Sequence, residues 1–356
     1  RSAAEAAARQ REALEAEPHR DSEYYRLAHL LHLERFEAEA RQTRVAARSF
    51  RQMADASDIH FAAGKLRQAC SAHMYQAVAE ARFELELLPE VLALVERRGW
   101  QDIPAVGVYY FAWRALTETE PQPWFERLRE TMHRHLRHFS PAEMRDVYTL
   151  AVNYCIRGIN TQQGAGRQEF YLQQVFDIYK EGLENGLYVE NGVLSRFTYK
   201  NIANAGLGLK AFDWVERFLL HYKDMLDPKH RESAYRYNLA NLHFRRSDYG
   251  QVLTLLTQTE FDDVLHQLDA RRMILRSYYE LGAFDALDSL LDSFQTFLRR
   301  RRDVGYLRQN YLNLVRLTRK LLQVPAADKA ARSRLRAEVE GTKALAEREW
   351  LLSKLG

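Results

Sequence analysis

The sequence predicts an all-α protein, an α-solenoid of about eight antiparallel helical hairpins. Apolar residues recur with helical spacing along nearly the whole chain, and no run of alternating β-branched residues marks a strand. Only 16 Gly and 8 Pro interrupt the 356 residues, which is typical of long helices joined by short turns. A hairpin-sized pattern also repeats toward the C-terminal half, as in proteins built from stacked repeats.

The hairpins follow one another from residue 24 to residue 353. In chain order, we expect helices at 24–40 with 42–55, 58–86 with 89–98, 104–118 with 122–138, 141–158 with 168–185, 194–210 with 212–226, 231–246 with 248–259, 265–281 with 283–302, and 304–323 with 327–353. Pro104 and Pro141 stand where helices should begin, and Gly99, Gly186 and Gly282 where helices should end.

Four regions follow from this division. The chain begins at Arg1 without a methionine, so we expect 1–22 to be a lead-in helix at the edge of a longer protein. Irregular hairpins then fill 23–193, a regular repeat covers 194–302, and a charged hairpin at 303–356 caps the array.

The repeat is anchored on an aromatic residue at Phe212, Tyr249 and Phe284, at intervals of 37 and 35 residues. An apolar residue follows each anchor three positions later, a leucine follows seven positions later, and an apolar residue precedes it by ten. These positions are Val215, Val252 and Leu287; Leu219, Leu256 and Leu291; and Ile202, Leu239 and Ile274. We expect them to pack helix against helix within a repeat and onto the next repeat.

The segment "AYRYNLANLHFRRSDYGQVLTLL" (234–256) resembles a tetratricopeptide repeat. The resemblance covers 194–302 in pattern and departs from the family where Leu275 replaces a small residue and Val252 replaces an alanine. It implies a divergent right-handed superhelix whose first helices line a concave groove. It also implies a non-catalytic scaffold that binds a protein or peptide, with an acidic peptide among the expected partners.

The resemblance also indicates which side chains face the groove. Some chaperone-adaptor members hold an acidic tail with a dicarboxylate clamp, and Lys200, Asn204 and Asn238 match three of its five positions. Asp269 and Met273 replace the two basic positions, so Arg271, Arg272 and Arg276 would have to substitute. The candidate peptide-binding residues are Lys200, Asn201, Asn204, Asn238, Asn241, Arg245, Arg272 and Arg276. The structural alternative is that these asparagines cap helices or cross-link neighbouring repeats.

A second function comes from the basic segment "FLRRRRDVGYLRQNYLNLVRLTRK". Arginines interleaved with Tyr306 and Tyr311 resemble a surface that binds phosphates and stacks bases. The candidate nucleic-acid-binding residues are Arg299, Arg300, Arg301, Arg302, Arg308 and Arg316. Because 52 Lys and Arg are nearly balanced by 48 Asp and Glu, leaving a net charge of +4, nucleic acid is the alternative rather than the first hypothesis. Consecutive arginines around a helix end are also typical of a solvated surface.

Catalytic and cofactor motifs are not apparent, so we expect no enzyme, no cofactor and no metal. Gly164 to Arg167 form a weak phosphate-loop signal, better interpreted as a connecting loop. His135 and His138 share a helix face but have no third ligand nearby in the sequence.

The cysteines indicate the compartment, and hydropathy indicates whether a helix could span a membrane. Cys70 and Cys155 have no C-x-x-C spacing and favour a reducing, cytoplasmic setting, with Cys155 a small buried residue. The most apolar stretch, "IPAVGVYYFAWRAL" (103–116), is too short to span a membrane and predicts a buried helix.

Overall fold

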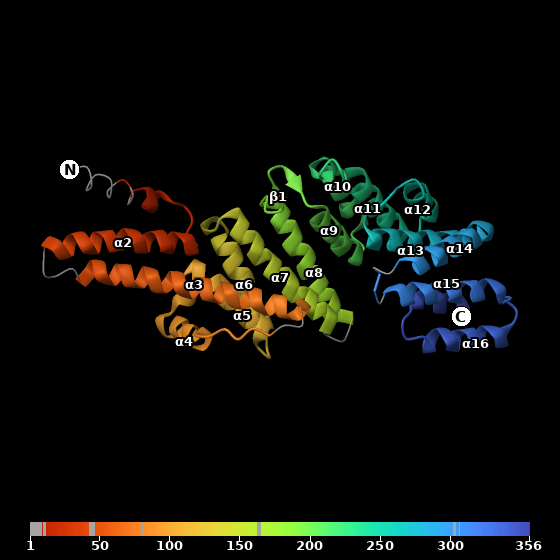
Figure 1. Ribbon diagram of the computed structural model, residues 1–356, viewed down its shortest axis with the longest axis horizontal. Helices are drawn as coiled ribbons and strands as arrows, with labels where there is room; N and C mark the ends of the chain where they lie inside the picture. The colour runs from red at the N-terminus through yellow and green to blue at the C-terminus, as the bar shows by residue number, and fades with distance from the viewer. Residues whose placement is uncertain are drawn as a thin grey trace. The chain divides into compact units, whose positions relative to one another are not determined.

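The computed structural model describes residues 9, 12–42, 47–79, 82–161, 165–301, 304–305 and 307–356. Helices make up most of these residues, which confirms the all-α prediction (Figure 1). The chain divides into two compact units, residues 1–191 and residues 192–356. The division into four regions expected from the sequence stays a prediction.

The first unit contains seven described α-helices and two 3₁₀ turns. They are α2 (Ser22–Gln42), α3 (Ala47–Ala79), α4 (Leu88–Arg98), α5 (Pro104–Thr117), α6 (Gln122–His135), α7 (Pro141–Thr161), α8 (Ala165–Glu184), η1 (Trp100–Asp102) and η2 (Leu136–His138). Helices α2 and α3, α5 and α6, and α7 and α8 pack as pairs, and both α3 and α7 pack against α5. The predicted buried helix is therefore α5, whose residues from Ala105 to Ala112 are all buried.

Helix α3 runs without a break where the sequence predicted a turn between residues 55 and 58. No Gly or Pro interrupts the sequence at this point. Ala56, Ile59 and Ala63 are buried and continue one apolar stripe, while Asp55 pairs with Arg98 at 2.7 Å. Side-chain burial therefore favours a continuous helix, and the predicted break is wrong.

Two short strands, β1 (Val189–Glu190) and β2 (Val193–Leu194), replace the expected start of a helix at 194. Asn191 and Gly192 join them, and both residues have positive φ, at 51° and 82°. An Asn-Gly pair is the sequence signal for this type of two-residue hairpin turn, because both central residues must adopt positive φ. The sequence contained the signal, and the prediction of no strand missed it.

The second unit contains nine α-helices and one 3₁₀ turn among its described residues. They are α9 (Arg196–Gly208), α10 (Phe212–Tyr222), η3 (Lys223–Met225), α11 (Arg231–Arg245), α12 (Tyr249–Leu256), α13 (Val264–Glu280), α14 (Phe284–Arg300), α15 (Leu307–Gln323), α16 (Lys329–Gly341) and α17 (Arg348–Leu355). Helix α11 packs against both α9 and α13, and each of these three helices also packs on the helix that follows it. This packing is compatible with consecutive helical hairpins.

The turn inside these hairpins is the same three times. The residue two positions before each anchor has positive φ: Lys210 at 58°, Ser247 at 62° and Gly282 at 68°. The next residue donates its backbone N–H to a carbonyl five residues earlier, at 2.9 Å in every case. This is the hydrogen bond of a Schellman helix end, so the repeat seen in the sequence corresponds to a repeated backbone geometry.

The anchors Phe212, Tyr249 and Phe284 are each the first residue of the helix after this turn. The positions three and seven residues later, such as Val252 and Leu256, are buried in all three hairpins. The position ten residues earlier is buried at Ile202 and Ile274 but only half-buried at Leu239. Nearly all of the predicted packing positions therefore lie in the core.

The C-terminal hairpin ends differently from the prediction of one helix over 327–353. Helix α16 stops at Gly341, and α17 begins at Arg348 after Glu347, which has a φ of 55°. Trp350 and Leu351 of α17 are buried in the same apolar cluster as Leu335 of α16 and side chains of α13 to α15. The chain must turn between α16 and α17 for these side chains to be buried on α13 to α15. The periodicity of apolar residues along one helix could not indicate this turn.

Candidate functional site

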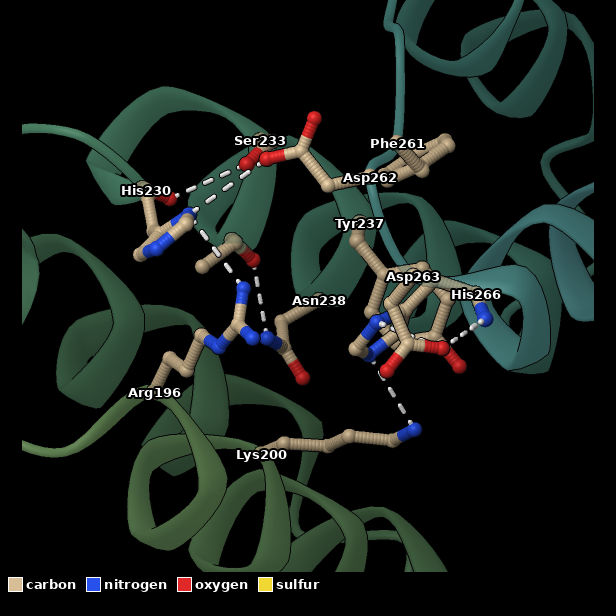
Figure 2. A pocket seen from close by; sticks show the side chains of 11 residues that line it. Arg196, Lys200, His230, Ser233, Tyr237, Asn238, Phe261, Asp262, Asp263 and His266 are labelled. Carbon is tan, nitrogen blue, oxygen red and sulfur yellow. Dashed lines mark hydrogen bonds and ion pairs between the residues drawn. The ribbon is translucent and has the colours of Figure 1, made fainter.

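A small polar cleft lies within the second unit, between α9, the start of α11 and the start of α13. Figure 2 shows cationic, imidazole, carboxylate and amide side chains converging on it from these three helices and from the residues just before α11 and α13. The residues that line it are Arg196, Lys200, His230, Ser233, Ala234, Tyr237, Asn238, Phe261, Asp262, Asp263 and His266.

Local helix chemistry places these groups. Arg196 and Lys200 stand four residues apart on α9, so both project from one face of the helix. Asp263 caps α13 by accepting hydrogen bonds from the backbone N–H groups of Leu265 at 2.6 Å and His266 at 3.2 Å. This cap fixes the first turn of α13 and brings the His266 ring to the cleft.

Each cation of the cleft contacts a histidine. A guanidinium nitrogen of Arg196 lies 3.2 Å from Nδ1 of His230, and Nζ of Lys200 lies 3.3 Å from Nε2 of His266. Lys200 also lies over the Tyr237 ring, 5.0 Å from its centroid. Because lysine only donates hydrogen bonds, Nε2 of His266 must accept from Lys200, and the His266 ring is neutral in this arrangement.

Asn238 has an unpaired carbonyl oxygen. Its side chain is 1% exposed, and its Nδ2 donates to the backbone oxygen of Ala234 at 2.8 Å. Its Oδ1 is buried and has no partner among the described residues. In Figure 2 this oxygen points into the space above Lys200. An unpaired buried acceptor costs about 1–3 kcal/mol, so it calls for an explanation such as an absent ligand.

The fixed charges of the cleft cancel. Arg196 and Lys200 contribute two positive charges, and Asp262 and Asp263 contribute two negative charges. Burial lowers the pKa of His266, and Lys200 and Arg196 lower it further, although Asp263 and Asp269 act in the opposite direction. Burial alone would raise the pKa of Asp263, but the N–H groups of His266 and Leu265 bring it below its ordinary value.

The predicted substitutes for the missing clamp residues already have a partner. Arg272 and Arg276 both pair with the carboxylate of Glu347, the latter at 3.2 Å. Arg272 also pairs with Asp269 at 2.7 Å, and Asp269 in turn accepts a hydrogen bond from the Tyr237 hydroxyl. The C-terminal segment therefore occupies these arginines, and the second replaced clamp position, Met273, is fully buried.

The other predicted groove residues divide into two kinds. Asn241 donates to Oδ1 of Asn204 at 3.0 Å and so links α11 to α9, as the structural alternative predicted. Asn201 on α9 and Arg245 on α11 are exposed. Of the predicted peptide-binding residues, the structure brings only Lys200 and Asn238 into the cleft.

The predicted nucleic-acid-binding arginines do not form one uniform surface. Arg299 and Arg300 are exposed, and Arg301 lies over the Phe297 ring at 5.7 Å. Arg308 donates to the backbone oxygen of Leu298 at 2.9 Å, and Arg316 pairs with Glu338. Arg302 lies outside the described residues, as does Tyr306.

The structure also describes most residues of the weaker candidates for a metal site, a nucleophile and a phosphate loop. His135 and His138 hydrogen-bond to each other at 3.0 Å, and no group of three metal-binding side chains occurs in the described part of the chain. Cys70 and Cys155 are buried free thiols, and burial raises the pKa of each to about 12, which opposes nucleophilic reactivity. Of the loop signal, Gly164 lies outside the described residues, and Gly166 lies in the first turn of α8.

The length and hydropathy of the helices bear on membrane contact. Within the residues that the structure describes, no helix is both long enough and apolar enough to cross a membrane.

Arg196, His230 and His266 belong to the cleft but were not predicted. The spacing of Arg196 and Lys200 was a usable signal, because residues four apart share a helix face. No comparable signal marked His230 and His266, since their approach to α9 depends on how three helices pack.

Comparison with known proteins adds no assignment. The sequence matches no model of a protein family, and a search of curated proteins finds no significant similarity.

Proposed function

We propose that the second unit is a non-catalytic module that binds a protein or peptide in the cleft between α9, α11 and α13. Three Schellman turns at equivalent positions and the packing of α11 on both α9 and α13 support a tetratricopeptide-like α-solenoid. In such an array the first helix of each hairpin lines the concave face, which is where Lys200 and Asn238 lie along the chain.

The observation that carries the proposal is the unpaired oxygen of Asn238 beside two cations. A peptide backbone N–H supplies the donor that Asn238 Oδ1 lacks. A carboxylate on the same peptide supplies an anionic acceptor for Lys200 and Arg196, which now contact imidazole nitrogens. An acidic peptide therefore complements both kinds of group, and the rigid helices lower the entropy lost on binding.

The setting we propose is cytoplasmic, because both cysteines are free thiols in the core. Nucleic acid remains the alternative partner, through Arg299 and Arg300, which are exposed on the last turn of α14. It has less support than a peptide, because Arg308 and Arg316 are held by other parts of the chain.

Affinity capture followed by mass spectrometry tests the proposal. The parent protein and the Asn238→Ala variant serve as bait, and Asn201→Ala is the matched control, since Asn201 is an exposed asparagine on α9 outside the cleft. We expect a protein partner that the parent and Asn201→Ala retain and that Asn238→Ala loses. A partner retained equally by all three baits would argue against the cleft.

A further inference from the structure

Protonation of His266 changes the net charge of the cleft. The two cations and the two carboxylates that line the cleft balance formally, so the cleft is neutral when its histidines are neutral. A proton on His266 makes the net charge positive. Protonation of this ring therefore strengthens the preference of the cleft for an anion.

The position of the proton follows from the contacts. Nε2 of His266 accepts from Lys200 at 3.3 Å, so the neutral ring carries its hydrogen on Nδ1, which lies 3.9 Å from Asp263 Oδ1. A second proton can only add to Nε2. Two donors, the imidazolium N–H and the Lys200 ammonium, would then lie side by side, with their nitrogens 3.3 Å apart. An oxyanion that approaches both would accept a hydrogen bond from each.

The other groups around His266 do not supply that oxyanion. From α9 it faces Lys200 and Arg196, and on its own segment it faces Asp263 and Asp269. Asp263 is committed to the cap of α13, and Asp269 to Arg272 and the Tyr237 hydroxyl. The Tyr237 ring meets His266 edge-on at 4.6 Å, and burial raises the pKa of its phenol, which stays neutral.

We propose that His266 is a ligand-binding residue of this cleft and that the cleft takes up a proton on His266 when it binds a carboxylate. The inference rests on the proposed function, since the carboxylate belongs to the acidic peptide. It adds that the bound carboxylate is shared between Lys200 and the imidazolium of His266, and that binding strengthens in acid.

The sign of the pH dependence follows from linkage. Burial and the neighbouring cations hold the pKa of His266 below 6.5 in the free protein, and a bound carboxylate raises it. The gain in affinity is therefore complete below the free pKa and is lost as the pH rises through the bound pKa. The ligand must stay ionised, which requires a pH above about 4.3 for a glutamate side chain.

Nuclear magnetic resonance of the intact chain, labelled at histidine, measures this directly. N-acetyl-L-glutamate is the probe, because it carries a carboxylate for Lys200 and an amide N–H for Asn238. We expect the pKa of His266 to rise when the probe saturates the cleft. Each unit of rise corresponds to about tenfold tighter binding at a pH below the free pKa than at pH 8.

Two variants provide the controls. His266→Gln keeps a neutral polar side chain and the backbone N–H that Asp263 caps, and it should bind the probe with an affinity that no longer depends on pH. His243→Gln removes another histidine of the second unit, on α11, which lies outside the cleft and pairs with Asp248 at 3.1 Å. It should keep the pH dependence of the parent.

The outcomes separate the inference from the proposed function. Binding of the probe with an unchanged His266 pKa and equal affinity at both pH values overturns the inference and leaves peptide binding in place. If the probe binds at neither pH, both the inference and the proposed function are overturned. A parent-like pH dependence in His266→Gln also overturns the inference, because the proton would then bind elsewhere.

Discussion

Single residues in the second unit adopt states that cost folding free energy. Ser247 and Lys210 have positive φ although they are not glycine, and Asn238 keeps a carbonyl oxygen buried without a partner. Ser247 and Lys210 occupy the positive-φ position of the repeated turn, which explains their unfavourable conformation. The state of Asn238 has no such structural reason, which is why we assign it to binding.

Replacing Ser247 with glycine should stabilise the protein by about 0.5–1 kcal/mol. The left-handed conformation costs a non-glycine residue about 1–2 kcal/mol, and the extra flexibility of glycine when unfolded takes back part of the gain. Ser247 is exposed and only its backbone N–H is engaged, with Phe244. Denaturant unfolding measures the change. Gly282→Ala at the equivalent turn should destabilise, and a Ser247→Gly variant less stable than the parent would contradict the repeated turn.

Glu143 should make stability depend on pH in the first unit. Burial raises its pKa above 4.5, although the Tyr109 hydroxyl, which donates to it at 2.9 Å, acts in the opposite direction. A carboxyl group with a raised pKa in the folded state stabilises at pH values below its unfolded pKa and loses that contribution as the pH rises through its folded pKa.

The measurement is the free energy of unfolding of the parent and of Glu143→Gln between about pH 4 and pH 7. Relative to the variant, the parent should lose stability as the pH rises. A constant difference across this range would show that Glu143 titrates alike in the folded and unfolded states.

Individual helices obtain their stability from the neighbours on which they pack. Helix α12 is only 8 residues long, too short to be stable alone, and its buried side chains Val252 and Leu256 pack among residues of α11 and α13. Loss of one such side chain should therefore affect three helices.

Leu256→Ala should cost about 2–5 kcal/mol, as other large-to-small core substitutions do. Leu256 is 3% exposed, whereas Leu220 on α10 is 67% exposed, so Leu220→Ala is the matched control and should change little. Hydrogen exchange should also accelerate in α11 and α13. Unfolding of Leu256→Ala that coincides with that of the parent would remove Leu256 from the core.

For the helices, the sequence predicted the turns of the repeat well, and it predicted poorly the features that depend on tertiary packing. The anchors Phe212, Tyr249 and Phe284 each begin a helix, because turn chemistry is encoded locally. The continuous α3 and the turn before α17 depend instead on burial against distant helices. The same limit applies to the site: Lys200 and Asn238 followed from position in the repeat, whereas His266 did not.

Over the whole molecule, the chain forms two compact units, and only the second contains the repeat and the cleft. In that unit Glu347 binds Arg272 and Arg276, so the C-terminal segment fills part of the face that the sequence assigned to a ligand. A peptide is left with the groups around Lys200 and Asn238. We propose that these groups, rather than the arginines at the end of α14, hold the partner.

Titration of the captured partner at two salt concentrations distinguishes these two surfaces, with Asn238→Ala and a variant in which Arg299 to Arg302 are glutamine. Asn238→Ala leaves the charge unchanged and should weaken binding by about 1–3 kcal/mol at both salt concentrations. The arginine variant should bind as the parent does. Normal binding by Asn238→Ala, together with weak binding and a reduced salt dependence in the arginine variant, would contradict the account and favour nucleic acid.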